Sequence, residues 1–235
     1  EIYGDRVVWV PWRRPGFQLG LDIVAVQREH PEAVGVILGG HGITAWGATS
    51  DRAEANSRWI IDAAQAHIDA HGDPEPFGPI VVEPVADRRA VAARLAPMLR
   101  AVASQDQRMV GHFTDSDVVL DFVSRAKLEA LAELGTSCPD HFLRTKIKPL
   151  VVPHHASDDQ LAELHERYRA DYTAYYERHA APGSPAMRGA DPLIVLVPGV
   201  GLFSYGRDAQ TARVAAISLA SVSAILLVDV LGAAS

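Results

Sequence analysis

The stretch VGVILGGHGITAWG, residues 34–47, decides the fold that we expect for this chain. It begins with an unbroken apolar run, which is typical of a strand covered on both faces. A glycine loop at residues 39–42 follows, and residues 43–46 predict a second short strand that Gly47 ends. Because glycines flank His41, we expect a tightly packed loop that holds the imidazole in a fixed direction.

Residues 1–72 around this stretch predict one compact α/β unit. A strand at residues 7–10 and a helix with apolar positions at helical spacing precede the stretch. Asp51, with Glu54 three residues later, predicts the capping box of the helix that follows. We expect this second helix to end at Gly72.

A second α/β section is expected at residues 80–235, after a linker rich in proline and glycine at residues 73–79. Its predicted strands lie at residues 80–82, 109–113, 150–152, 193–197 and 202–205. The polar segment 136–148 predicts an irregular loop. Ser157 and Gln160 form a second capping box, which predicts the start of a long helix.

The sequence contains an internal repeat at an offset of 201 − 42 = 159 residues. It aligns residues 40–47, GHGITAWG, with residues 199–206, GVGLFSYG. Both copies predict a strand, a glycine loop, a second strand and a helix. Only the first copy carries a side chain that can bind a metal, because Val200 stands where the first copy has His41.

Length and composition place the chain among ordinary globular proteins and exclude a coiled coil, a collagen or a disordered chain. It has 235 residues, of which 48% are hydrophobic, and a net charge of −7. Because no cluster of lysines and arginines offsets the acidic balance, we expect no nucleic-acid or anionic-membrane partner. Small molecules and further copies of the chain, as a homo-oligomer, are the expected partners.

Two further features bear on the compartment and on the membrane. Cys138 is the only cysteine, which excludes an intramolecular disulfide and favours a reducing cytosol. The apolar residues 214–228 fall short of the roughly 20 residues that span a bilayer, so they favour a buried helix.

His41 is the first candidate for chemistry. An imidazole between glycines at the end of a buried strand suits zinc or another divalent metal. The alternative is a histidine that satisfies a hydrogen bond of its own loop. One histidine does not make a site, because catalytic zinc uses three protein ligands. The pair His154-His155 is a weaker candidate, since adjacent side chains of a strand point apart.

The segment 136–148 is the second candidate, because it concentrates hydroxyl groups and positive charge that suit a phosphate or a carboxylate. Its candidate substrate-binding residues are Thr136, Ser137, Asp140, His141, Arg144 and Lys146. The alternative is a solvated loop with local capping bonds. A stripe of tyrosines could stack on a sugar, but its helical spacing favours a core or a subunit interface. The stripe comprises Tyr168, Tyr172, Tyr175 and Tyr176.

Several of these motifs together resemble one known family. WRRPG at residues 12–16, followed by a helix and by VILGGHGITAWG at residues 36–47, resembles the C-terminal half of the class II aldolase/adducin module. Residues 134–146, 184–188 and 197–206 extend the match. This set is similar to the aldolase portion of bifunctional rhamnulose-1-phosphate aldolase/short-chain alcohol dehydrogenase proteins, and the resemblance covers residues 5–213.

The resemblance implies class II aldolase-like α/β/α layers and a cytoplasmic, zinc-dependent enzyme of rhamnose catabolism. Such an enzyme cleaves rhamnulose 1-phosphate, a ketose 1-phosphate, to dihydroxyacetone phosphate and lactaldehyde. His41 matches the family's third zinc ligand. The family's His-x-His pair and its acid/base glutamate would lie upstream, since this sequence contains no His-x-His.

We expect the resemblance to end near residue 215, and the dehydrogenase domain of such proteins to lie outside these residues. We therefore expect a fragment that is inactive by itself. The alternative is a non-catalytic, structural or sugar-phosphate-binding module of the same family, with segment 136–148 as its contact surface.

Overall fold

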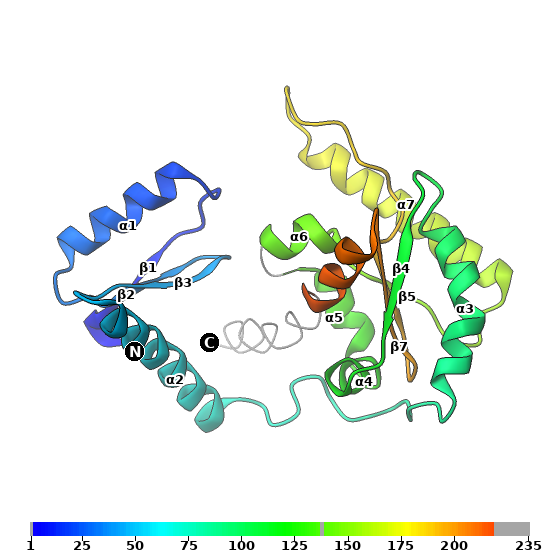
Figure 1. Cartoon of the computed structure of the whole chain (residues 1–235), viewed down its shortest axis with the longest axis horizontal. Helices are drawn as coiled ribbons and strands as arrows, with labels where there is room; N and C mark the ends of the chain where they lie inside the picture. Colours follow the sequence, from blue (N-terminus) through cyan, green and yellow to red (C-terminus); the bar gives the residue numbers. More distant parts are fainter. Residues whose placement is uncertain (1, 137–138, 219–235) are drawn as a thin grey trace. The chain divides into compact units, whose positions relative to one another are not determined.

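The computed structural model describes residues 2–136 and 139–218. They divide into two compact units, one that extends to Pro74 and one that begins at Glu75 (Figure 1). The fold is of the mixed α/β class in both units, as the sequence predicts.

The first unit is a three-stranded sheet with two long helices. Its elements are η1 (Gly4–Arg6), β1 (Val7–Val10), α1 (Phe17–Glu29), β2 (Gly35–Leu38), β3 (Gly42–Ala45) and α2 (Ser50–His71). The strand order is β1-β2-β3, with β1 parallel to β2 and β3 antiparallel to it. Alternate side chains of β1 and β2 pack with Leu19 of α1, and this cluster of Val10, Val36 and Leu38 forms the core of the unit.

The start of α2 differs from the prediction by two residues. Thr49, not Asp51, is the N-cap, because its hydroxyl accepts a hydrogen bond from the Arg52 N–H at 3.2 Å. Thr49 has extended backbone angles, whereas Asp51 already lies in the first turn, where its charge favours the helix dipole. The helix ends at Gly72, as expected.

The second unit is a four-stranded sheet between helices. Its elements are α3 (Arg88–Val102), β4 (Val110–Thr114), α4 (Asp117–Val123), α5 (Leu128–Leu134), α6 (Pro139–Thr145), β5 (Leu150–Val151), α7 (Asp158–His179), β6 (Ile194–Val197) and β7 (Gly201–Gly206). Residues 209–218 are also helical. The strand order is β4-β7-β6-β5, and only β5 and β6 are parallel.

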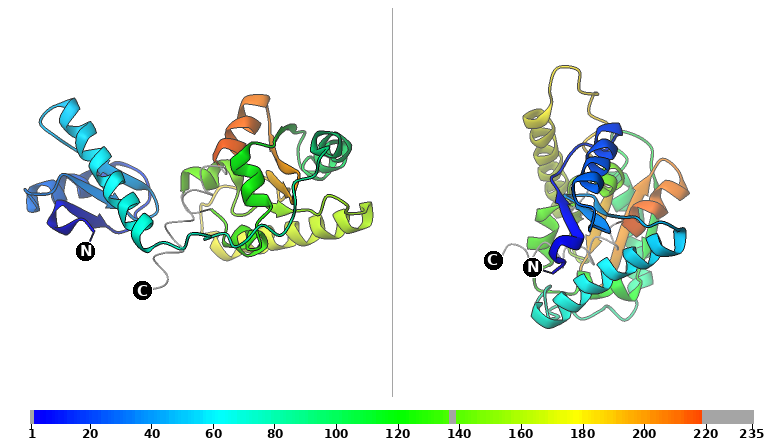
Figure 2. Two further views of the ribbon diagram at one scale, coloured as in Figure 1. Left: turned by 90° about the horizontal axis from the view of Figure 1, so that it is seen from below. Right: turned by 90° about the vertical axis from the view of Figure 1, so that its left-hand side faces the viewer.

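Helices cover both faces of this sheet, which is why β6 and β7 are apolar along almost their whole length. Val195 and Val197 pack with α3 and α7, whereas Ile194 and Leu196 point the other way and pack with α4 and α5. Figure 2 shows α7, in yellow, on one side of the sheet and residues 209–218, in orange-red, on the other. The second unit thus has α/β/α layers.

Two predictions for the second unit are wrong. Residues 80–82 form no strand, because only Ile80 makes an isolated bridge, to Arg125, and Val81 lies exposed beyond it. Segment 136–148 is not irregular throughout, since residues 139–145 form α6. Pro139 suits the first position of a helix, where its missing N–H costs nothing. The helix expected from residue 214 onward lies mostly outside the described residues.

The internal repeat is confirmed in the strand pairing. In the first hairpin the paired residues are Gly35–Ala45, Val36–Thr44, Ile37–Ile43 and Leu38–Gly42. In the second they are Ile194–Ser204, Val195–Phe203, Leu196–Leu202 and Val197–Gly201, the same register after a shift of 159. The cap of the following helix repeats as well, because Asp208 accepts from the Thr211 N–H where Thr49 accepts from Arg52.

Candidate functional site

The backbone around His41 is held by glycines, as the sequence predicts. Gly40 has a φ of 70°, in the left-handed region, and the His41 N–H donates to the Leu38 carbonyl at 2.9 Å. A Cβ at position 40 would lie 2.8 Å from Cδ1 of Trp12. Glycine therefore lets the indole of Trp12 lie against the loop, with its ring nearly parallel to the His41 imidazole.

The His41 ring has one nitrogen engaged and one available. Nε2 lies 2.8 Å from the carbonyl oxygen of Arg13. A carbonyl can only accept, so Nε2 is the N–H nitrogen, and in the neutral ring Nδ1 then carries the lone pair. Histidines that bind metals commonly donate their other N–H to a backbone carbonyl in this way, which fixes both the tautomer and the ring direction.

The described residues supply one candidate metal ligand, His41, and not a complete set. Nowhere in residues 2–136 and 139–218 do three or more His, Cys, Asp or Glu side chains gather closely enough to hold a metal ion. The pair His154-His155 precedes α7, its rings stand nearly perpendicular at 86°, and His155 is exposed. His41 thus fits zinc as a single ligand within a larger donor set.

The structure distributes the candidate residues of segment 136–148 over different surroundings. The backbone N–H of Thr136 donates to the Ile147 carbonyl at 2.9 Å. His141 is half-buried, Arg144 is exposed and Lys146 is buried. Ser137 and the side chain of Asp140 fall outside the described part of the chain. Lys146 therefore points into the protein, while Arg144 faces solvent, and the binding role of this set stays a prediction.

Lys146 connects α6 to the loop before β6. Its ammonium donates to the carbonyls of Gly189, at 2.9 Å, and of Asp191, at 2.5 Å, and lies 4.3 Å from the ring centre of Tyr172. Burial lowers the pKa of this amine to about 8, because the charged form loses its water. Lys146 also has a positive φ of 61°, since its N–H closes α6 by donating to Phe142.

An ionic network with a buried centre, Asp191 and His165, lies next to Lys146. The Asp191 carboxylate accepts hydrogen bonds from the Arg169 guanidinium, from Nε2 of His165 at 3.1 Å and from the Asp106 N–H at 2.8 Å. Arg169 also binds both oxygens of Asp106, at 2.9 and 3.0 Å. These bonds hold the pKa of Asp106 at about 2. Sequence reasoning missed the network, because its members lie far apart in the chain.

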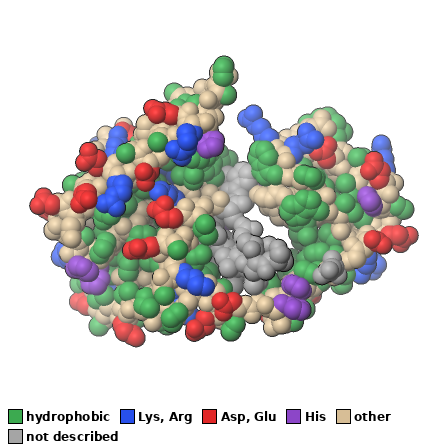
Figure 3. All heavy atoms as spheres, turned by 180° about the vertical axis from the view of Figure 1, so that it is seen from behind, with side chains coloured by type: hydrophobic (Ala, Val, Ile, Leu, Met, Phe, Trp, Pro, Cys, Tyr) green, Lys and Arg blue, Asp and Glu red, His purple; other side chains and the backbone are tan. Residues whose placement is uncertain are grey.

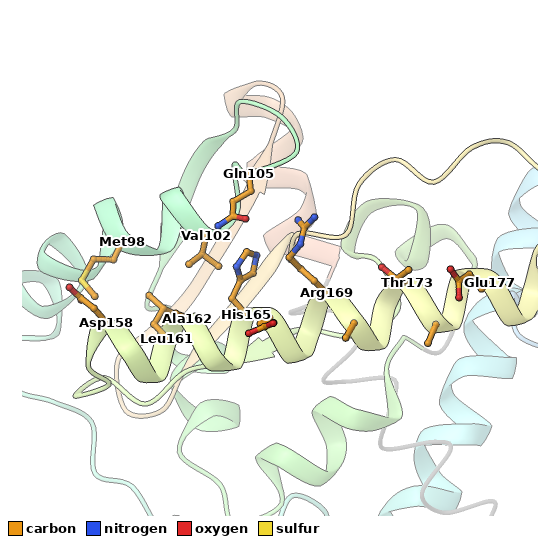
Figure 4. Close-up of a pocket in the computed structure, with 13 residues that line it drawn as sticks. Met98, Val102, Gln105, Asp158, Leu161, Ala162, His165, Arg169, Thr173 and Glu177 are labelled. Carbon is orange, nitrogen blue, oxygen red and sulfur yellow. The ribbon is translucent and has the colours of Figure 1, made fainter.

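A cavity of about 730 Å3 lies beside this network, between α3 and α7. Figure 4 shows His165 and Arg169 pointing from α7 toward it, opposite Val102 and Gln105. The Arg169 guanidinium already forms ion pairs with the carboxylates of Asp106 and Asp191. These ion pairs stabilise the wall of the cavity. The network therefore joins α7, the loop after α3 and the loop before β6 in a fixed arrangement.

Lys146 gives the second unit a distinctive pH dependence. Its pKa falls from 10.5 in the unfolded chain to about 8 in the folded one, so between these values the unfolded chain binds more protons. The free energy of unfolding should therefore rise by about 1–3 kcal/mol from pH 8 to pH 10.5. Denaturant titrations of the wild type and of Lys146→Met isolate the contribution of Lys146 to the free energy of unfolding, because the ionisation of tyrosines affects both proteins alike. Equal slopes against pH in the two proteins would contradict it.

The surface shows charges of both signs. On the face drawn in Figure 3, Lys and Arg side chains are interspersed with Asp and Glu side chains. Within the described ranges, no helix is long and apolar enough to cross a membrane.

Two family models match the chain, and both describe class II aldolase domains. Residues 1–68 match the family model "Class II Aldolase and Adducin N-terminal domain", and residues 90–226 match "Aldolase class II, second domain". A protein of Bacillus subtilis (strain 168), named uncharacterized oxidoreductase YuxG, is 33% identical over 224 residues. That alignment covers 91% of this chain but only 32% of the relative, so the chain spans about a third of the length of the relative. No solved structure matches the chain.

The second of these models alone includes more than half of the residues, and the first includes the loop that carries His41. The chain belongs to the class II aldolase family.

Proposed function

We propose that this chain is part of a zinc-dependent class II aldolase that cleaves rhamnulose 1-phosphate, a ketose 1-phosphate, to dihydroxyacetone phosphate and lactaldehyde. The observation that carries the proposal is the state of His41. Its Nε2 is bound to the Arg13 carbonyl, and Nδ1 is left as a lone-pair nitrogen on a rigid loop.

The second hairpin supports a chemical role for this histidine. Val200 occupies the equivalent position, is fully buried, and donates its N–H to Val197 at 3.0 Å just as His41 donates to Leu38. The two hairpins have the same register. A hairpin of this register therefore forms in the second unit without a histidine at the equivalent position.

The proposed centre includes residues beyond those described. Zinc, when bound, would act as a Lewis acid on the carbonyl and hydroxyl oxygens of the substrate and stabilise the enediolate. His41 would bind it, and the Arg13 carbonyl would hold the ring in place. The remaining ligands and the acid/base group would come from other parts of the longer protein.

The same proposal includes the wider organisation of the protein. Residues 1–72 would be the C-terminal half of the class II aldolase/adducin module, and residues 73–79 the linker to the second unit. The printed name of the relative, an oxidoreductase, supports a fusion with a dehydrogenase domain. We also propose a sugar phosphate as ligand, a homo-oligomer and the reducing cytosol as the compartment.

The test is His41→Ala in the full-length protein. We expect the loss of bound zinc, measured by metal analysis, and a fall in kcat/KM for ketose 1-phosphate cleavage of more than about a hundredfold. Even residues that only orient a ligand cost 10- to 100-fold. His155→Ala, which removes an exposed histidine, is the control and should leave both quantities unchanged.

Two outcomes would count against the proposal. A His41→Ala protein with normal zinc content and normal turnover would refute the role of His41. A wild-type protein that binds the sugar phosphate but neither binds zinc nor cleaves the substrate would instead favour the non-catalytic module.

A further inference from the structure

The cavity between α3 and α7, which we call the α7 groove, follows one face of α7. The α7 residues that line it run from Asp158 to Glu177, and 177 − 158 = 19 residues span about 28 Å along a helix axis. The volume of about 730 Å3 lies within the roughly 300–1,000 Å3 of sites that bind small molecules. The α7 groove therefore suits a long, narrow ligand better than a compact one.

Part of the lining of the α7 groove is apolar. Val102 of α3 and Leu161 of α7 are buried members of the core that also line the groove, and Met98 packs beside them. Ala162 and Ala170 of α7 add only methyl groups. Because an aliphatic chain that lies on such a surface is removed from water, the lining favours a ligand with methylene groups.

The charged side chains make the α7 groove negative. Asp158, Glu166 and Glu177 line it, are exposed, and form no ion pair with residues that the structure describes. Among the described lining residues, Arg169 alone carries a fixed positive charge, and two carboxylates outside the lining already bind it. A cationic ligand would therefore be attracted by three carboxylates, and an anionic ligand would be repelled.

His165 adds a hydrogen-bond acceptor to the wall of the α7 groove. The residue is only 4% exposed, and Figure 4 shows its ring pointing from α7 toward the groove, opposite Val102 and Gln105. Nε2 lies 3.1 Å from the Asp191 carboxylate, which can only accept, so Nε2 carries the hydrogen. In the neutral ring Nδ1 then keeps its lone pair, and no described residue donates to it. An N–H group of a ligand would satisfy this nearly buried atom.

The charges around His165 favour the neutral ring. Asp106 and Asp191 carry two negative charges, and Arg169 and Lys146 carry two positive charges close to them. Because these four charges cancel, the site does not require a third cation. The acceptor character of Nδ1 and the carboxylates of the groove therefore both favour a ligand that carries N–H groups and positive charge.

We propose that the α7 groove binds a linear aliphatic polyamine. Its methylene chain lies along α7 on the apolar lining, one amino group donates to Nδ1 of His165, and the others pair with the carboxylates. Glu166 and Glu177 are 177 − 166 = 11 residues apart, close to three turns, so both lie on one face at about 16 Å along the axis. A chain with several ammonium groups can reach both carboxylates, whereas a compact cation reaches one.

Isothermal titration calorimetry with spermine measures the affinity of the full-length protein. Tetraethylene glycol, an uncharged chain of similar length, is the ligand control. Spermine should bind at least about tenfold more tightly than the glycol, because only spermine pairs with the carboxylates. Equal affinities, or no binding of spermine, would overturn the proposal.

Glu166→Gln tests the role of the carboxylates. It should weaken the binding of spermine by about threefold or more, because one ion pair is lost. Glu163→Gln is the matched control, since Glu163 is 73% exposed on the same helix but does not line the groove. This variant should keep the affinity of the wild type. If both variants weaken binding equally, spermine recognises only the general negative charge of the surface, and the proposal is wrong.

Ala170→Trp tests the place of binding. Ala170 is exposed and lines the groove, so a larger side chain there fills the groove without entering the core. The binding of spermine should be lost, while urea denaturation of the variant should match that of the wild type. A variant that unfolds normally and still binds spermine would place the ligand elsewhere.

Nitrogen-15 NMR of the histidine rings tests the contact with His165 without any substitution. The Nδ1 resonance of His165 should shift when spermine is added, because this nitrogen then accepts a hydrogen bond. The resonances of His155, which is exposed and does not line the groove, should not shift. Spermine that binds and leaves Nδ1 of His165 unchanged would refute the proposed contact.

A comparison of two chain lengths tests whether the groove is open in the whole protein. Spermine should bind the 235-residue chain and the full-length protein alike. Binding to the 235-residue chain alone would show that another part of the protein covers the groove, and the proposal would fail. None of these measurements depends on zinc or on cleavage of a sugar phosphate, so this inference and the aldolase proposal can fail separately.

Discussion

Asp191→Ala should lower the free energy of unfolding of the second unit by about 3–5 kcal/mol. The carboxylate of Asp191 is almost fully buried, and it accepts hydrogen bonds from Arg169, His165 and the backbone of Asp106. Its removal leaves the buried Nε2 of His165 and the Asp106 N–H without this acceptor, and Arg169 loses one of its two carboxylate partners. Breaking one side of a buried ion pair costs far more than the pair itself contributes.

Urea denaturation followed by far-UV circular dichroism measures this effect. The four tryptophans lie at positions 9, 12, 46 and 59, so tryptophan fluorescence follows the first unit alone and should not change. Asp171→Ala is the matched control: it removes a half-exposed partner of Lys148, at 3.3 Å, and should cost less than about 1 kcal/mol. If the two variants have the same effect, the network contributes no more than a surface ion pair.

Gly135→Ala should destabilise the second unit by about 3 kcal/mol, since two costs add. Gly135 follows α5 with φ 80° and ψ −152°, a backbone region that is essentially restricted to glycine. A Cβ there would also lie 2.3 Å from the carbonyl oxygen of Ile147. That carbonyl accepts from the Thr136 N–H, so it cannot move without loss of a hydrogen bond.

Gly183→Ala separates the strain from the clash, because Gly183 has a φ of 89° but no atom within 4 Å of the added Cβ. It should cost about 1 kcal/mol, for backbone strain alone. Both are measured by the same denaturation experiment, as a shift of the second unit's transition. If both variants lose the same free energy of unfolding, the Ile147 carbonyl has moved aside and the Cβ added at position 135 meets no clash.

Local patterns predicted most of the elements that frame the candidate site. The glycine loop around His41, the strands on either side of it and the repeat at an offset of 159 residues all follow from short-range signals. The strand predicted at residues 80–82 fails for a long-range reason. An apolar run becomes a strand only where a neighbour pairs with it, and there Ile80 has a single bridge.

No local sequence pattern indicated the network of ion pairs around Asp191 either. Asp106 and Arg169 are 63 residues apart, and a charge pattern in the sequence does not show which carboxylate an arginine will meet. Lys146 was predicted as part of a binding surface because lysines favour phosphates. The fold instead turns its ammonium toward two backbone carbonyls, because its backbone closes α6 in a left-handed conformation.

The sequence by itself determined the strand, glycine loop, strand and helix that occur twice, because glycine positions and apolar periodicity act within a few residues. It also determined that only the first copy carries a histidine in its loop. The tertiary structure decided which nitrogen of His41 is free, since that depends on the Arg13 carbonyl 28 residues away. It also decided that β7 has a neighbour and that β3, within the described residues, has none, because strand pairing joins segments that no local pattern links.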